Sequence, residues 1–230
     1  KVKENMQKST RPVDDIGLVE PKTKHFSETL ALASGSELHG FDIVYETYGK
    51  LNKECSNAIL ICHALTGDQF ASGKNPITKR EGWWNTAVGT NKALDTKKYF
   101  VICANVLGGC MGTFGPKDIN QKNNEPYGLN FPVITIKDMV KAQEALLDYF
   151  KIEKLLCVIG GSMGGMQVLQ FCASFPDRTL SAIPIACSSS HSAQNIALNE
   201  LARQAIMADP EWIKGDYNKN KTSPKKGLAV

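Results

Sequence analysis

The sequence predicts an α/β fold, built on a mostly parallel, twisted sheet with helices on both faces. Two short runs, residues 57–64 and 99–106, have the continuous hydrophobicity of strands buried on both faces. Between residues 137 and 186, helical and strand patterns alternate. Such alternation requires right-handed crossovers and places helices against the sheet. With 230 residues, 42% of them hydrophobic, the chain can bury one sizeable core.

The N-terminal half begins with residues 1–24, which are polar and contain two prolines, so we expect a flexible arm there. Residues 25–32 and 41–48 alternate apolar and polar side chains around an "ASGS" turn, which predicts a β-hairpin. The two central strands are predicted at 57–62 and 99–105.

The C-terminal half continues with an amphipathic helix over residues 137–150, for which Thr135 and Asp138 provide a capped start. A buried strand at 155–159 follows, and then a helix at 163–175 that ends before a proline. A strand at 180–186 brings the predicted number to about six.

Charge and cysteine usage exclude several classes of function. The 27 basic and 23 acidic residues are interspersed except at the lysine-rich ends, so we expect neither nucleic-acid nor membrane binding. No apolar run reaches the roughly 18 residues of a membrane span. Seven cysteines without a C-x-x-C pair are typical of buried thiols in a reducing compartment. We therefore expect a cytoplasmic protein without a metal site, a disulfide framework or a bound cofactor.

The stretch "GGSMG" at 160–164 matches G-x-S-x-G, the nucleophile elbow of serine enzymes. Its context supports the match, because a predicted strand precedes Ser162 and a predicted helix follows it. The N-terminus of that helix brings a positive dipole end and the free N–H of Met163 toward a developing oxyanion. We predict that Ser162 is a catalytic nucleophile and not merely part of a glycine turn.

A near-copy of this stretch, "NVLGGCMGTFG", places Cys110 at the equivalent position. The residues after Cys110 are polar and rich in glycine and proline, so no helix lowers the pKa of its thiol. We expect a loop that at most lines a pocket. The stretch "GDQFASGKN" also fails as a phosphate-binding loop, because its glycine spacing is wrong and Asn75 replaces the metal-binding hydroxyl.

The loop "HALTGD" after strand 57–62 is expected to supply the second oxyanion donor, through the backbone N–H of Leu65. His63 precedes the elbow, which is the wrong chain order for the base, so a packed histidine is expected. Trp83 and Trp84 are consistent with either a ligand wall or core packing.

Ser162 also needs a base and an orienting acid. Chain order nominates Asp177 and His191, but Asp177 ends the helix that runs away from the elbow, and His191 lies in a polar segment. An α/β-hydrolase sheet has about eight strands, against about six here. We therefore expect the last strands, the acid and the histidine beyond Val230, and an inactive 230-residue chain.

Four stretches together resemble the homoserine O-acetyltransferase family of the α/β-hydrolase superfamily: "HALTGD", "GWWNTAVGTNKALDTKKYFVICANVLGGCMGTFGP", "GGSMGGMQVLQF" and "DPEWIKGDY". The resemblance implies ping-pong acyl transfer from acetyl-CoA, the co-substrate, through Ser162 to L-homoserine, a step of methionine biosynthesis. The amides of Leu65 and Met163 would hold the oxyanion. The family's acid, histidine and carboxylate-binding arginine follow a "GL" segment that is matched here by Gly227 and Leu228.

The resemblance also divides the chain into an arm (1–24), an incomplete α/β-hydrolase core (25–191) and the beginning of a helical lid (192–230). It implies a homodimer through the lid. The first lid helix carries an apolar face formed by Leu198, Leu201, Ala202, Ala205 and Ile206. Succinyl-CoA as donor, serine as acceptor, an esterase or thioesterase, and a binding module that has lost the chemistry remain the alternatives.

Overall fold

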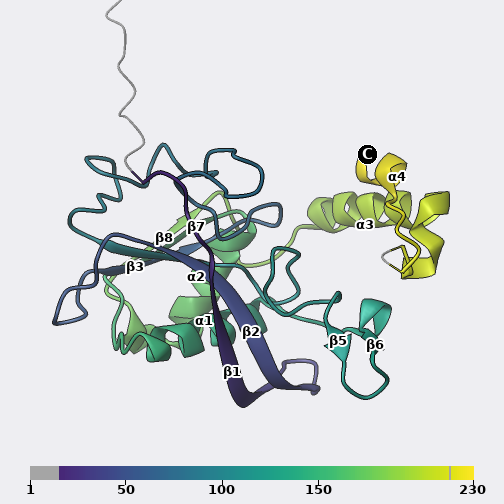
Figure 1. Cartoon of the computed structure of the whole chain (residues 1–230), viewed down its shortest axis with the longest axis horizontal. Helices are drawn as coiled ribbons and strands as arrows, with labels where there is room; N and C mark the ends of the chain where they lie inside the picture. The colour runs from purple at the N-terminus through teal and green to yellow at the C-terminus, as the bar shows by residue number, and fades with distance from the viewer. Residues whose placement is uncertain (1–15, 218) are drawn as a thin grey trace, which may run out of the picture.

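The computed structural model describes residues 16–217 and 219–230 and contains a six-stranded sheet (Figure 1). The strand order is β1-β2-β4-β3-β7-β8. Strands β4, β3, β7 and β8 run parallel, whereas β1 pairs antiparallel with β2, and β2 pairs antiparallel with β4. The strands are β1 (Lys22–Ala31), β2 (Glu37–Tyr48), β3 (Ala58–Cys62), β4 (Phe100–Ala104), β7 (Cys157–Gly161) and β8 (Ala182–Ile185). The predicted hairpin and parallel strands are confirmed.

Two helices cover one face of this sheet, α1 (Ile136–Tyr149) and α2 (Met163–Ser174). Their side chains Leu146 and Phe171 join a buried cluster with alternate strand residues such as Leu60. The capping box predicted for α1 is present, because Thr135 and Asp138 bond reciprocally.

The opposite face is covered by the irregular segment 63–99, and helices on both faces were therefore predicted incorrectly for the described residues. Phe70 and Val88 of this segment pack on Ile61 and Cys103. The physical reason is the handedness of crossovers. The connections β4 to β7 and β7 to β8 move in one direction along the sheet, so both helices lie on one face. The connection β3 to β4 moves in the opposite direction, and here it contains turns and no helix.

The expected arm is shorter than predicted on its C-terminal side. Residues 1–15 lie outside the described residues, but Val19 is buried and its N–H donates to the carbonyl oxygen of Lys74 at 3.1 Å. Strand β1 already begins at Lys22. Apolar contacts of Val19 hold this part of the segment against the body, although the segment as a whole is polar in composition.

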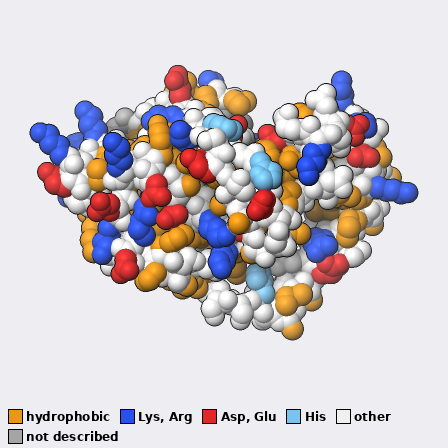
Figure 2. All heavy atoms as spheres, turned by 90° about the horizontal axis from the view of Figure 1, so that it is seen from below, with side chains coloured by type: hydrophobic (Ala, Val, Ile, Leu, Met, Phe, Trp, Pro, Cys, Tyr) orange, Lys and Arg blue, Asp and Glu red, His pale blue; other side chains and the backbone are white. Residues whose placement is uncertain are grey.

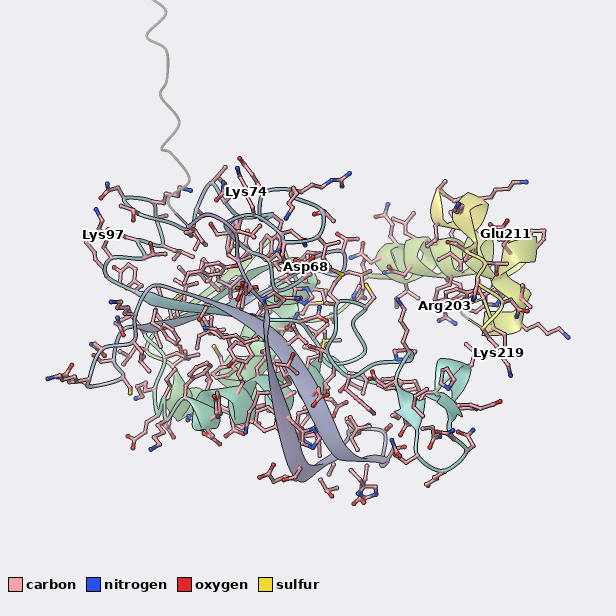
Figure 3. All side chains as sticks on the ribbon, in the orientation of Figure 1. Asp68, Lys74, Lys97, Arg203, Glu211 and Lys219 are labelled. Atoms are coloured by element: carbon pink, nitrogen blue, oxygen red, sulfur yellow. The ribbon has the colours of Figure 1, made fainter. Side chains whose placement is uncertain are left out.

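A smaller lobe extends from the body after β8 (Figures 1 and 3). It contains α3 (Ala193–Ala208), the 3-10 helix η3 (Pro210–Gly215) and α4 (Lys225–Leu228). The labelled Arg203, Glu211 and Lys219 belong to this lobe. Figure 2 shows a hollow between the lobe and the body. The remaining short elements are β5 (Ile119–Asn120), β6 (Glu125–Pro126), η1 (Gly128–Asn130) and η2 (Pro176–Arg178).

The helices of the described residues are short or amphipathic. Within residues 16–217 and 219–230, none has the length and hydropathy that crossing a bilayer requires.

Candidate active site

The candidate site lies where the sheet reverses its winding. Strands β3 and β7 are neighbours, but the chain leaving β3 covers one face and the chain leaving β7 forms α2 on the other. In open α/β sheets, a crevice forms at the carboxyl ends of such a strand pair. The loop containing Leu65 leaves β3 at this edge, and Ser162 leaves β7 beside it. The topology therefore brings together two segments that are about a hundred residues apart in the sequence.

Ser162 is the single residue between β7 and α2, and its backbone is strained. It has φ 56° and ψ −122°, a region that L side chains rarely adopt. Two hydrogen bonds hold this conformation: its N–H donates to Ile185 O at 3.0 Å, and its carbonyl accepts from Met166 N at 3.1 Å. The side chain is exposed and does not cap the helix. The hydroxyl is therefore presented at the surface, as a nucleophile elbow requires.

Glycines on either side allow the elbow helix to approach strand β3. A Cβ on Gly160 would lie 2.6 Å from Cys62 O, and a Cβ on Gly164 would lie only 2.0 Å from the same atom. Neither glycine has a positive φ, so close approach, and not an unusual turn, requires them. Backbone contact at this distance brings the first turn of α2 directly against the end of β3.

Two backbone amides lie on the two segments that meet at this edge of the sheet. Met163 is the first residue of α2, so its N–H has no partner within the helix. Leu65 lies in the turn after β3, and its side chain is 73% exposed. Neither N–H donates to another described residue. The predicted oxyanion donors thus remain free to bind an external oxygen.

His63 is a packed residue, in agreement with the expectation. It is 1% exposed, and burial lowers its pKa. Its Nδ1 lies 2.8 Å from the carbonyl oxygen of Ala64, and its Nε2 accepts the N–H of Val106 at 3.2 Å. These bonds fix a neutral tautomer with the proton on Nδ1. Both nitrogens are occupied, so His63 orients the loop and does not act as a base.

The other candidate residues are placed as follows. Cys110 is exposed in a loop, and no helix follows it. Asp177 lies in η2, which follows the C-terminal end of α2, while His191 is exposed just before α3. Among the described residues, none accepts a hydrogen bond from the Ser162 hydroxyl or donates one to it.

The two tryptophans stack with ring centroids 5.3 Å apart. Trp84 packs against the buried cluster, whereas Trp83 is 42% exposed and donates from Nε1 to the carbonyl oxygen of Asp68 at 2.9 Å. Figure 3 shows Asp68 in the segment that covers this face of the sheet. The pair therefore supports the site loop and also presents one aromatic surface.

A hollow of about 1020 Å³ lies away from Ser162, between the β1–β2 hairpin and residues 114–132. His25, Asp42 and Lys122 line it. In the part of the chain that the structure describes, no cluster of three His, Cys, Asp or Glu side chains could hold a metal ion.

Sequence reasoning missed two buried glutamines behind the elbow. Both lie inside predicted helices, Gln143 in 137–150 and Gln167 in 163–175, where the sequence pattern assigns them no role in the site. The available signal was an amide side chain at a helical position otherwise occupied by apolar residues.

The strand order, the strained serine and the free amides define an α/β-hydrolase. The profile of the alpha/beta hydrolase fold family matches residues 57–226, and the chain belongs to this family. Within it, the chain is 63% identical over 201 residues to a homoserine O-acetyltransferase of Pelagibacter ubique (strain HTCC1062), covering 87% of this chain and 54% of that protein. Other curated relatives with this name share 54–59% identity.

Solved structures agree on the fold. The homoserine O-acetyltransferase of Bacillus anthracis superposes with a TM-score of 0.85 at 32% identity, covering 93% of this chain and 58% of that one. Esterase E22 superposes with a TM-score of 0.82 at 33% identity, covering 92% and 59%. The chain spans about half the length of the curated relatives that it matches.

Proposed function

We propose that the protein to which this chain belongs is an acyltransferase that moves the acetyl group of acetyl-CoA to the hydroxyl of L-homoserine. The observation that carries the proposal is the coincidence of a strained, exposed Ser162 with 63% identity to a curated homoserine O-acetyltransferase.

In the proposed reaction, the Ser162 Oγ attacks the thioester carbonyl carbon and gives up its proton to a base. The carbonyl oxygen becomes an oxyanion between the N–H groups of Leu65 and Met163. The C–S bond then breaks, CoA leaves as the protonated thiol, and acetyl-serine remains. Homoserine's hydroxyl attacks this ester, loses its proton to the same base, and releases free Ser162 as O-acetylhomoserine forms.

The residues that the structure describes do not supply the base that Ser162 needs in this reaction. Both nitrogens of His63 are occupied, and His191 makes no hydrogen bond to Ser162. We propose, from the family resemblance, that an acid and a histidine following the segment matched by Gly227 and Leu228 complete the triad.

Ester hydrolysis is the second candidate, because esterase E22 shares the fold with a TM-score of 0.82. The same acetyl-serine would then be attacked by water. Succinyl-CoA as the donor, or serine as the acceptor, would use the same groups at Ser162 and would differ only in the side chains around the acyl and amino-acid portions.

The proposed partner is a second copy of the protein, bound through the lid, residues 192–230. Leu198 and Leu201, on the predicted apolar face of α3, are 58% and 60% exposed, whereas Ile206 of the same face is half-buried beside Gly227. The proposed compartment is the cytoplasm, supported by seven cysteines that are all free thiols.

The test is acetylation of the full-length gene product by acetyl-CoA without homoserine, followed by intact-mass and peptide analysis. We expect one acetyl group on Ser162, released by homoserine faster than by water. Ser162→Ala should abolish labelling, while Ser174→Ala, at the far end of α2, should not. Hydrolysis at the same rate with or without homoserine would favour an esterase, and faster labelling by succinyl-CoA would change the donor.

A further inference from the structure

The two amides of the candidate oxyanion site lie on separate segments, Leu65 on the loop after β3 and Met163 on α2. Both must point at one oxygen from about 3 Å for the site to work. A displacement of one segment by about 1 Å can cost a hundredfold in rate. The structure must therefore hold the loop and the helix in a fixed relation.

Gln167 joins these two segments directly. It is completely buried, and its Nε2 donates to the carbonyl oxygen of His63 at 3.1 Å and to that of Met163 at 3.4 Å. One amide group thus bridges two carbonyl oxygens, that of His63, which lies two residues before Leu65, and that of Met163, the other oxyanion residue.

A second buried amide orients Gln167. Gln143 of α1 is 3% exposed, and its Nε2 donates to Gln167 Oε1 at 2.7 Å. Its own Oε1 accepts from the thiol of Cys62 at 3.7 Å. Burial raises the pKa of Cys62 to about 12, so this thiol keeps its proton. Because Cys62 precedes His63, these contacts form a closed ring from β3 through α1 and α2 back to the loop.

The ring has only one consistent orientation. Two carbonyls face Nε2 of Gln167, so this group must be the donor and Oε1 must accept. Gln143 must then present its nitrogen to Gln167 and its oxygen to the thiol. An apolar side chain of similar length would fill the same volume, so the amides add directed bonds rather than buried area.

We infer that Gln167 is a positioning residue, oriented by Gln143, that fixes the spacing between the oxyanion amides of Leu65 and Met163. This inference rests on the proposed function. Gln167 touches neither substrate nor the reacting atoms, and acts through the two carbonyls that it binds.

The test compares Gln167→Met and Gln167→Glu with the full-length wild type. Gln167→Met should slow acetylation of Ser162 by about ten- to a hundredfold while KM for acetyl-CoA changes little. Gln170→Met is the matched control, because Gln170 lies on the same helix and bonds only Ser174, within that helix. It should leave the rate unchanged.

Gln167→Glu provides a signature that a packing role would not give. A protonated glutamic acid can donate to His63 O and accept from Gln143, whereas the carboxylate can only accept. Its rate relative to wild type should therefore fall by about tenfold for each pH unit above the glutamate pKa and level off below that pKa, while the Gln167→Met ratio stays flat.

Hydrogen exchange of residues 63–67, measured by mass spectrometry, gives a readout independent of activity. Faster exchange in Gln167→Met, with circular dichroism unchanged, supports the inference. If Gln167→Met showed unchanged exchange and a wild-type acetylation rate, the inference about Gln167 would be overturned while the proposed function would stand. An equal loss of acetylation rate in Gln170→Met would have the same consequence. A wild-type protein that is never acetylated at Ser162 would overturn the proposed function, and the inference with it.

Discussion

Replacing Gly164 by alanine would test whether close approach of α2 to β3 builds the site. The added Cβ would lie 2.0 Å from Cys62 O, and real Cβ atoms essentially never approach closer than 3.0 Å. Helix and strand must therefore separate locally by about 1 Å. Gly161 is the matched control, because a Cβ there would meet only Ile185 O, at 4.0 Å.

The expected magnitude follows from this displacement. Overpacking of a well-packed region costs about 1–3 kcal/mol of unfolding free energy. A shift of about 1 Å between Met163 and Leu65 should also lower the acetylation rate of Ser162 by about a hundredfold. Gly161→Ala should change both quantities little.

The assay combines urea unfolding with the rate of acetyl-serine formation in the full-length protein. The acetylation rate is measured without urea, at a pH at which each variant is folded. The close-approach argument would be wrong if Gly164→Ala acetylated at the wild-type rate. It would also be wrong if Gly161→Ala lost as much as Gly164→Ala, because the open position would then be as sensitive as the crowded one.

Two further predictions concern stability. Asp138 is fully buried and accepts hydrogen bonds from Ala33 N, Thr135 N and Thr135 Oγ1 at 2.7–2.9 Å. Asp138→Ala should therefore lower the free energy of unfolding, measured with urea, by about 3 kcal/mol, and Asp138→Asn should lower it less. A loss below about 1 kcal/mol in Asp138→Ala would contradict this prediction. Burial raises the pKa of Glu46 in the folded chain from 4.5 to about 7. The unfolded chain loses the Glu46 proton at lower pH than the folded chain, so the free energy of unfolding should fall by about 3 kcal/mol as the pH rises from 4.5 to about 7. Glu46→Gln should remove that slope in denaturation measured from pH 4.5 to 8, and an unchanged slope would refute the assignment.

The strands were predictable because local composition dictates them. Residues 58–62 and 100–104 are buried at every position, and a continuous apolar run is the direct sequence signature of that environment. The α1 start was equally local, since Thr135 and Asp138 cap it across three residues. Strand β8 is different, because all four of its residues are exposed among the described residues despite their apolar character.

The lobe after β8 was predictable in part. An apolar helical face was expected from Leu198 to Ile206, and α3 spans it. The contact that anchors it was not visible, because the side chain of Asp209 accepts from the N–H of Gly227, eighteen residues further on. Hydrogen bonds lower the pKa of Asp209, so the carboxylate form favours this contact.

The sequence by itself determined the strands, the capped helix and the serine elbow, because each depends on side chains within a few residues of one another. Only the tertiary structure decided which face the helices cover, that His63 has both nitrogens occupied, and that Gln143 and Gln167 connect the elbow to the loop after β3. These features depend on strand order and on contacts between segments up to about a hundred residues apart. A local sequence pattern carries no information about contacts between segments so far apart. The direction of the crossovers brings the carboxyl ends of β3 and β7 together.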